Sequence, residues 1–318
     1  MVEIFKWKEK RALVTGGLGF IGGSIVESLL DHGSQVDIVD NCSVGKITEA
    51  PEGIRNLIIR DLSDVSTFDI LPSDYDIVFH FGAPCSIRLF EQDPLAYYQN
   101  AFNGSYLIRK FCSDKKIPYL VSASSATVYG KLGNKYDSLD ESLPLSPVNI
   151  YGLSKCSDEL LDSQFPDVKI LNARIFVAYG AREYLKKELA STAYTFALNM
   201  IRDEQPELWG DGFQNRDFIY IDDLVNLILK ASELQLEGSY NFGTGRPIMY
   251  IDLIEEYLNK ILGKDIEPVK QKNPYGNFYV NSLLANMQKL SKHLGDFYKV
   301  RYIEEGLRDM IKEMRGCI

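Results

Sequence analysis

Short apolar runs alternate with longer amphipathic segments through the first half of this chain, and few folds accommodate that order. The runs are rich in Val, Ile and Leu and lie at residues 12–14, 36–39, 57–59, 77–81, 119–122 and 170–175. Continuous apolar runs of this kind are typical of strands buried on both faces of a parallel sheet. Helical patterns connect them, at residues 21–31, 94–112 and 153–164. The alternation predicts an α/β fold with a doubly wound parallel sheet.

The pattern changes after Gly180. Residues 181–207 are charged and helical in character, a strand and a helix are predicted again at 217–233, and the remainder is mostly helical with polar loops. A length of 318 residues fits one large domain with a second lobe. We therefore predict a nucleotide-binding domain from residues 1–180 plus about 215–245, and a smaller, mostly helical substrate-binding lobe from residues 181–214 and 246–318.

The overall charge and hydropathy exclude several classes of protein. The formal net charge of −9 disfavours a nonspecific nucleic-acid binder, which needs a basic surface. No run approaches the roughly 20 apolar residues that cross a bilayer, and the first residues lack the apolar core of a signal peptide. We expect a soluble cytoplasmic protein without nucleic-acid or membrane partners.

The cysteines and histidines do not form a metal-binding pattern. The five cysteines are scattered and contain no CxxC pair, which indicates reduced thiols rather than disulfides or zinc ligands. The three histidines, His32, His80 and His293, have no metal-type spacing. His80 ends an apolar run, so we interpret it as a structural residue. No metal site is predicted.

A glycine-rich loop follows the first predicted strand and opens the first predicted helix. Its glycines at 16, 19 and 22 permit a tight turn, a close approach of backbone N–H groups to a pyrophosphate, and close packing of the helix on the sheet. Asp40 ends the second strand, where a carboxylate accepts hydrogen bonds from the adenosine ribose hydroxyls and repels a 2′-phosphate. The loop and Asp40 together predict a Rossmann domain that binds NAD rather than NADP.

Two further segments carry candidate catalytic groups. Tyr151 and Lys155 are four residues apart, on one face of a predicted helix. A tyrosine titrates near 10, and an ammonium group beside it favours the phenolate, which makes Tyr151 a usable proton carrier. Ser125 lies in a serine-rich segment where the fifth strand ends, at the sheet edge where α/β proteins bind ligands. Its hydroxyl can bond the substrate oxygen whose proton Tyr151 moves.

Taken together, these motifs resemble those of the extended short-chain dehydrogenases of the NAD-dependent epimerase/dehydratase type, which act on nucleotide sugars. The resemblance spans roughly residues 10–245 and rests on TGGLGFIGG, Asp40, His80–Ala83, Asp93-Pro94 with Asn100 and Asn103-Gly104, SSATVYG, YGLSK, RIFVAYGAR and RDFIYIDDL, in that order. The serine loop is most similar to that of UDP-galactose 4-epimerases and their relatives.

The resemblance implies a role for each matching residue. The implied catalytic group is Ser125, Tyr151 and Lys155, and the implied substrate contacts are Ser125, Tyr151 and Arg216. The implied NAD contacts are Gly16, Gly19, Phe20, Ile21, Asp40, Asn41, Asp61, Leu62, Phe81, Ala83, Asn100, Tyr151, Lys155 and Phe176. The implied substrate is a nucleotide sugar, with UDP preferred and GDP or CDP as alternatives. A homodimer is a further expectation of the family.

The implied reaction is a 4-epimerisation. Tyr151 as phenolate takes the proton of the sugar 4-hydroxyl, hydride leaves C4 for the nicotinamide ring, and Ser125 holds the developing carbonyl oxygen. The transient 4-keto sugar then turns and receives the hydride on its other face, so NAD is not consumed.

Other reactions remain as alternatives. A 4-dehydrogenase that releases the 4-keto sugar would use the same residues. Sugar 4,6-dehydratases carry acids just after the catalytic Ser or Thr, and Ala126 and Thr127 occupy those positions here, which disfavours a dehydratase. Asp40 disfavours an NADPH-dependent reductase. A noncatalytic NAD sensor is a hypothesis from another class, and the intact set of Ser125, Tyr151 and Lys155 argues against it.

The chain departs from the family pattern on the nucleotide side of the substrate. Val177 stands where many members carry an Asn that bonds the diphosphate. A second Arg, usual before the C-terminal Ala-Asp, is missing, and Lys270 and Lys272 are the only cations of residues 270–286. Diphosphate binding must therefore be made elsewhere. Three aromatic residues of that stretch, Tyr275, Phe278 and Tyr279, are interpreted as packing residues of the lobe rather than as a sugar pocket.

Overall fold

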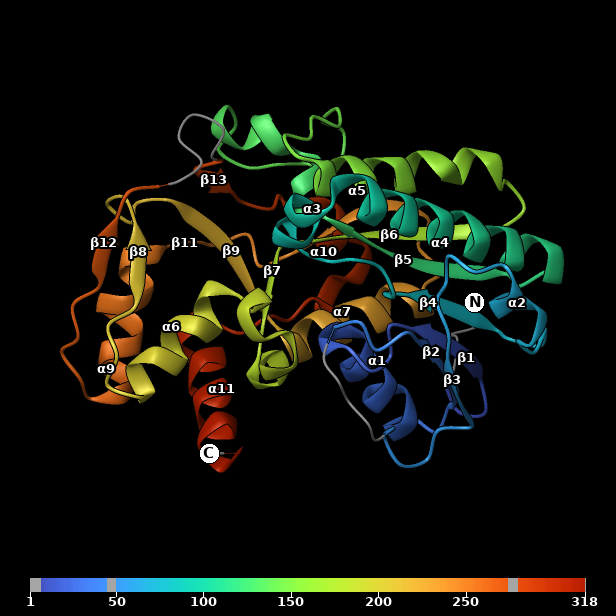
Figure 1. The fold of residues 1–318 in the computed structure, drawn as a ribbon, viewed down its shortest axis with the longest axis horizontal. Helices are drawn as coiled ribbons and strands as arrows, with labels where there is room; N and C mark the ends of the chain where they lie inside the picture. Colours follow the sequence, from blue (N-terminus) through green and yellow to red (C-terminus); the bar gives the residue numbers. More distant parts are fainter. Residues whose placement is uncertain (1–6, 45–49, 274–279, 318) are drawn as a thin grey trace.

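Seven parallel strands form the central sheet of the protein, in the order β10-β6-β5-β4-β1-β2-β3 (Figure 1). The computed structural model describes residues 7–44, 50–273 and 280–317. The strands are β1 (Arg11–Thr15), β2 (Gln35–Asp40), β3 (Asn56–Ile59), β4 (Ile77–His80), β5 (Tyr119–Ser125), β6 (Lys169–Ile175) and β10 (Gly238–Phe242). The strand order reverses at β1, which has β2 on one side and β4 on the other. The predicted Rossmann fold is confirmed.

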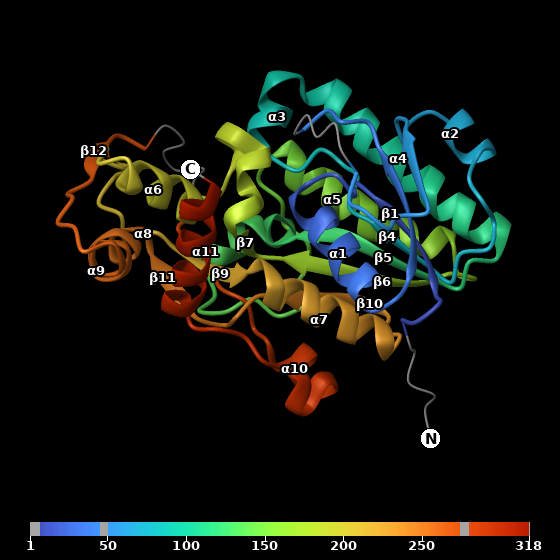
Figure 2. The same ribbon diagram turned by 90° about the horizontal axis from the view of Figure 1, so that it is seen from below.

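Helices cover both faces of this sheet, with α4 on one side and α7 on the other (Figure 2). The helical segments of this part are α1 (Phe20–Asp31), α2 (Ser66–Asp69), α3 (Ile87–Gln92), α4 (Pro94–Lys115), η1 (Ala126–Val128), η2 (Gly130–Asn134), α5 (Ile150–Leu161), η3 (Asp162–Gln164) and α7 (Ile221–Glu233). Helix α4 packs against α5, and α1 packs against α7. Among the described residues, no helix is both long enough and apolar enough to cross a membrane.

The two-sided cover explains the continuous apolar runs of the sequence. Ala12 and Val14 of β1 join the hydrophobic cluster that contains α1 and α7, whereas Leu13 joins the cluster that contains α4. Successive side chains of a strand point to opposite faces, so a strand covered on both faces needs apolar residues at every position.

A second lobe lies beyond the carboxyl edge of the sheet and contains short strands as well as helices (Figure 1). Strand β9 pairs with β7, β11 and β13, and β12 pairs with β8. The strands are β7 (Val177–Tyr179), β8 (Glu207–Trp209), β9 (Asn215–Tyr220), β11 (Pro247–Met249), β12 (Val269–Gln271) and β13 (Ser282–Leu283). The helical segments are η4 (Ala181–Leu189), α6 (Thr192–Ile201), α8 (Tyr250–Asp252), η5 (Leu253–Leu258), α9 (Asn259–Leu262), α10 (Gln288–Leu294), η7 (Gly295–Phe297) and α11 (Ile303–Cys317).

Two strands of the central sheet differ from the sequence-based expectation. Strand β3 was expected to be buried, but it is the edge strand and its Leu57 and Ile59 are 37% and 52% exposed. Strand β10 closes the other edge and was not predicted, because its sequence GSYNF is short and begins with polar residues. A strand at the edge of a sheet has a neighbouring strand on one side only, so its sequence carries a weaker hydrophobic pattern.

A buried carboxylate connects the pieces of the second lobe to the end of the central sheet. Asp217 of β9 is fully buried and accepts hydrogen bonds from the backbone N–H groups of Thr244, Gly245 and Ala285. These donors lie in the turn after β10 and in the segment after β13. Asp217 therefore fixes the position of its neighbour Arg216 relative to the sheet edge.

Candidate active site

A cavity of about 980 Å³ lies at the carboxyl ends of the central strands and extends to the second lobe. Ligand sites of open α/β sheets occupy this position, beside the point where the strand order reverses. Every predicted site residue lines the cavity: Gly16, Gly19, Phe20, Ile21, Asp40, Asn41, Asp61, Leu62, Phe81, Ala83, Asn100, Ser125, Tyr151, Lys155, Phe176 and Arg216. The fold thus brings together residues that are distant in the sequence.

The glycine loop between β1 and α1 forms one end of the cavity. Gly16 has a φ of +68°, and a Cβ atom there would lie 2.6 Å from the carbonyl oxygen of Phe81. A Cβ atom on Gly22 would collide with the carbonyl oxygen of Gly16. The N-cap of α1 is Gly19, which provides no side-chain acceptor. The loop is therefore a close-packed cradle whose backbone N–H groups suit an anionic group.

Asp40 at the end of β2 is held by the glycine loop. Its carboxylate accepts hydrogen bonds from the backbone N–H groups of Leu18 at 3.1 Å and Cys42 at 2.8 Å. Burial raises the pKa of Asp40 above its ordinary value, although both hydrogen bonds act in the opposite direction. The side chain keeps acceptor capacity on the cavity wall, as recognition of ribose hydroxyls requires.

Three predicted cofactor contacts form one hydrogen-bonded group beyond Asp40. Asp61 accepts hydrogen bonds from Asn41 at 2.8 Å, from Asn100 at 3.0 Å and from the backbone and hydroxyl of Ser63. Burial raises the pKa of Asp61, but the hydrogen bonds from Ser63, Asn41 and Asn100 together lower it below its ordinary value. Asp61 is therefore a carboxylate at neutral pH and orients the two amides.

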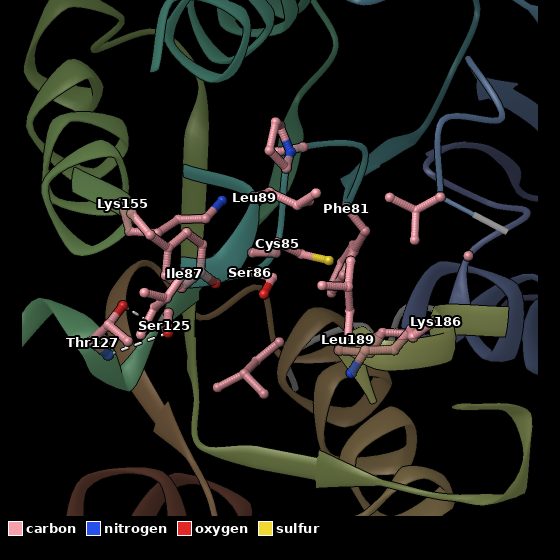
Figure 3. Close-up of a pocket in the computed structure, with 18 of the residues that line it drawn as sticks. Phe81, Cys85, Ser86, Ile87, Leu89, Ser125, Thr127, Lys155, Lys186 and Leu189 are labelled. Carbon is pink, nitrogen blue, oxygen red and sulfur yellow. Dashed lines mark hydrogen bonds between the residues drawn. The ribbon is translucent and has the colours of Figure 1, made fainter. Parts of the chain in front are cut away.

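Ser125 and Thr127 lie side by side at the catalytic end of the cavity, so named here because it carries the candidate catalytic residues (Figure 3), and Tyr151 lines the same cavity. The Ser125 oxygen accepts hydrogen bonds from the backbone N–H of Thr127 at 3.2 Å and from its hydroxyl at 3.0 Å. The Ser125 hydroxyl acts on the Tyr151 hydroxyl in the direction that lowers its pKa. The Tyr151 ring packs against Phe90, with 5.6 Å between the ring centroids. The contacts from Thr127 hold Ser125, and the contact with Phe90 holds Tyr151.

The partner of Lys155 is a residue that the sequence reasoning missed. The Lys155 ammonium lies 3.3 Å from a carboxylate oxygen of Asp158, and the two side chains are 5% and 1% exposed. The other carboxylate oxygen of Asp158 is buried and has no hydrogen-bond partner among the described residues. The spacing of Lys155 and Asp158 on helix α5 could have indicated the pair, because residues three apart share a helix face.

The structure differs from the sequence-based expectation for Tyr151. Burial raises the pKa of Tyr151 above its ordinary value, and nearby Cys85 and Asp158 raise it further, while the hydrogen bond with Ser125 acts to lower it. Lys155, which was expected to lower this pKa, is not among the groups that shift it, and its ammonium is paired with Asp158.

Helix α5 is anchored to the sheet by a buried ion pair. Glu159 accepts hydrogen bonds from the guanidinium group of Arg174 in β6, at distances down to 2.7 Å. The same carboxylate accepts hydrogen bonds from Ser124 of β5 and Ser239 of β10. The helix that carries Tyr151 is therefore tied to three adjacent strands.

Arg216, a predicted substrate contact on β9, lines the cavity on the side of the second lobe. Arg216 stacks over the ring of Tyr250 and donates hydrogen bonds to the carbonyl groups of residues 215, 280 and 281. Val177 lines the cavity beside it, whereas Lys270 and Lys272 do not. The aromatic residues Tyr275, Phe278 and Tyr279 lie outside the described residues.

The position of Asp40 generates a test of cofactor choice. We expect Asp40→Ser to weaken NAD binding and to strengthen NADP binding, because the carboxylate that repels a 2′-phosphate is gone. The ratio of the NAD affinity to the NADP affinity should fall about 10-fold or more. Calorimetric titration of ligand-free protein measures both affinities. Asp31→Ser, at the exposed end of α1, removes the same charge and should keep the wild-type ratio. An unchanged ratio in Asp40→Ser would refute the assignment.

Comparison with known proteins places this site in a family. The family model described as NAD dependent epimerase/dehydratase family matches residues 12–243. An uncharacterised protein of Methanocaldococcus jannaschii is 30% identical over 323 residues, which cover 95% of each of the two proteins.

Two solved structures are similar over nearly the whole chain. A UDP-N-acetylglucosamine 4-epimerase of Methanobrevibacter ruminantium, solved with UDP-N-acetylmuramic acid, is 29% identical with a TM-score of 0.85, over 98% of this chain and 100% of that chain. A UDP-glucose 4-epimerase of Thermus thermophilus, solved with NAD, is 26% identical with a TM-score of 0.85, over 97% of this chain and 100% of that chain.

NAD is the cofactor, and the residues of the cavity fit it. The glycine loop, whose backbone packs too closely to admit a Cβ atom at Gly16 or Gly22, suits the pyrophosphate, and Asp40 has acceptor capacity for the adenosine ribose. The fold, the ordered motifs and the match over residues 12–243 agree: this chain belongs to the NAD-dependent epimerase/dehydratase family.

Proposed function

We propose that this protein is a nucleotide-sugar 4-epimerase that works through a transient 4-keto sugar. The observation that carries the proposal is the grouping of Ser125, Tyr151 and Lys155 on the wall of the cavity that also holds the glycine cradle. The next positions, Ala126 and Thr127, provide no acid for a dehydration, and the Thr127 hydroxyl is already bonded to Ser125. The likeness to two UDP-sugar 4-epimerases supports the same reaction.

The hydrogen bonds around Ser125 determine what its hydroxyl can do. Both contacts from Thr127 are donated to the Ser125 oxygen, so the hydroxyl hydrogen of Ser125 is directed elsewhere. It can be donated to the Tyr151 oxygen or to an oxygen on the substrate. A sugar O4 atom between the two hydroxyls would be held at the group from which Tyr151 removes the proton.

Tyr151 has to lose its proton before it can act as a base. The Lys155 ammonium, one helical turn away, supplies the positive charge that stabilises the phenolate to the extent that Asp158 does not neutralise it. Bound NAD supplies the hydride acceptor that makes a reversible oxidation at C4 feasible. The chain itself positions the 4-hydroxyl and moves its proton, and the buried site limits the escape of the keto sugar.

A UDP-sugar is the proposed substrate. The two similar epimerases are UDP-sugar enzymes, and one was solved with a UDP-sugar. Arg216 lines the cavity on the side of the second lobe and would bind the diphosphate. Val177 has no side-chain amide for this purpose, unlike the Asn of many family members. GDP- and CDP-sugars are the alternatives. The cytoplasmic location expected from the sequence stays a prediction.

Turnover of a sugar panel tests the proposal. Purified protein with NAD is incubated with UDP-, GDP- and CDP-sugars, and products are followed by NMR. We expect catalytic formation of a C4 epimer, and Tyr151→Phe should lower the turnover about 10²- to 10⁴-fold while NAD affinity changes little. Tyr302→Phe, an exposed tyrosine, is the matched control.

The other outcomes are distinct. A 4-keto product formed in a stoichiometric amount, with NADH left on the protein, would contradict the epimerase proposal and favour a 4-dehydrogenase. If the protein binds NAD but converts no sugar of the panel, and Tyr151→Phe leaves the NAD affinity unchanged, the enzymatic proposal is contradicted and an NAD sensor is favoured.

The pair of Lys155 and Asp158 generates a prediction for the pH dependence. Asp158 contributes to the raised pKa of Tyr151, so removal of its charge should lower that pKa. A base is active when deprotonated, so the acid limb of turnover in Asp158→Asn should move to lower pH. A pH series of kcat measures the shift, with Asp114→Asn, an exposed residue, as control. A limb that stays in place or moves to higher pH would show that Asp158 does not act on Tyr151.

We also propose that the protein is a homodimer formed through α4 and α5. These helices pack together and expose the apolar side chains of Leu95, Tyr106, Leu153 and Leu160, of which Leu95 and Leu160 are 67% exposed. Exposed apolar side chains on two helices that pack together are candidates for an interface.

The dimer proposal is tested by light scattering after size exclusion. We expect a dimer for the wild type and a monomer for the double variant Leu153→Glu with Leu160→Glu, because two charges would be buried without partners. Phe213→Glu, at an exposed aromatic residue between β8 and β9 of the second lobe, should remain a dimer. A monomeric wild type at working concentrations would refute the proposal.

A further inference from the structure

Lys186 is a cationic side chain on the cavity wall that no sequence motif indicates. It lies on the 3₁₀ segment η4, which packs against α1. Figure 3 shows Lys186 and Lys155 on different sides of the cavity. The Lys186 nitrogen lies 5.3 Å from the ring centroid of Phe20, the first residue of α1. Lys186 is therefore next to the glycine cradle, whereas Lys155 belongs to the catalytic end.

A buried acid holds Lys186 in place without using all of its donors. The ammonium donates one hydrogen bond to Glu183 at 2.9 Å, and the side chains of Lys186 and Glu183 are 19% and 0% exposed. Glu183 also accepts hydrogen bonds from the backbone N–H and the hydroxyl of Ser191. Its negative charge is thus shared among several donors. An ammonium group has three hydrogens, so Lys186 retains donors for a ligand.

The charge state of Lys186 suits an anion. Burial lowers the pKa of Lys186, but the nearby Glu183 and Cys85 raise it above its ordinary value. The side chain is therefore an ammonium at neutral pH. The neighbouring end of α1 carries no acidic residue in its first turn, so no carboxylate of that turn competes with a ligand for Lys186.

Three other cations on the cavity wall, Arg88, Lys155 and Arg216, make the following contacts away from the glycine loop. Arg88 donates to a main-chain carbonyl of η4 at 2.7 Å, and Arg216 donates to three main-chain carbonyls. Lys155 is paired with Asp158 at the catalytic end. Lys186 lines the cavity and contacts the helix of the glycine loop, whereas Arg182, which also contacts that helix, is paired with Glu27. The position and spare donors of Lys186 match a group with several anionic oxygens.

We propose that Lys186 binds a diphosphate group in this cavity. Two ligands carry a diphosphate group: NAD, the cofactor of the family, and the nucleotide sugar. Binding of the nucleotide sugar rests on the proposed function. The contact with Phe20 favours the diphosphate of NAD, because the glycine cradle begins there. A charged hydrogen bond to the diphosphate oxygens would supplement the backbone N–H groups of the cradle.

Binding measurements test this proposal without any turnover. NAD and UDP are titrated separately into ligand-free wild type, Lys186→Met, Lys186→Arg and Lys187→Met by calorimetry. Lys187 is exposed and adjacent in sequence, so its variant removes the same charge beside the site. We expect Lys186→Met to bind NAD about 10- to 100-fold more weakly, as for the loss of one charged hydrogen bond. Lys186→Arg should recover most of the affinity, and Lys187→Met should bind within twofold of wild type.

The two arms separate the sources of the diphosphate. A loss confined to NAD assigns Lys186 to the cofactor, and a loss confined to UDP assigns it to the nucleotide sugar. Retention of both affinities within twofold in Lys186→Met overturns the proposal, as does an equal loss in Lys187→Met. If UDP does not bind the wild type, the UDP-sugar proposal fails, and the NAD arm still decides the role of Lys186. Equal melting temperatures of the ligand-free proteins exclude a folding defect.

Discussion

The buried ion pair of Glu159 and Arg174 is the interaction on which the geometry of the active site depends. It joins α5 to β6, and the same carboxylate accepts hydrogen bonds from β5 and β10. Loss of one partner of a buried pair costs about 3–5 kcal/mol, because the other charge is left without compensation. Tyr151 lies two turns before Glu159 on the same helix. The distance between its hydroxyl and Ser125 at the end of β5 is therefore determined by an anchor outside the cavity.

The cavity combines two separate electrostatic tasks. At one end, Lys155 faces Asp158, so the positive charge available to Tyr151 depends on a buried carboxylate as much as on the lysine. At the other end, Lys186 faces Glu183 beside the glycine cradle. In both pairs an acid on the same segment, three residues away, holds the lysine. Such pairs fix the direction of a buried ammonium group.

The candidate site could be predicted well where one segment carries a whole motif. The glycine loop, Asp40, Ser125, Tyr151 and Lys155 all line the same cavity, because the carboxyl ends of parallel strands meet at one edge of the sheet. Lys186 and Asp158 were missed for a different reason. Neither belongs to a motif, and their importance depends on contacts with Phe20 and Lys155 that appear only after packing. The raised pKa of Tyr151 was missed because burial cannot be read from spacing.

The sequence by itself determined the parallel α/β domain, the family and the use of NAD, because apolar periodicity and backbone-binding glycines are local properties of the chain. It did not predict β10 or the exposure of β3, since the rank of a strand within a sheet depends on partners far away in sequence. Only the tertiary structure decided which charges face each other in the cavity. The pairing of Lys155 with Asp158 and the contact of Lys186 with α1 follow from how helices pack on the sheet, and burial then sets the strength of those interactions.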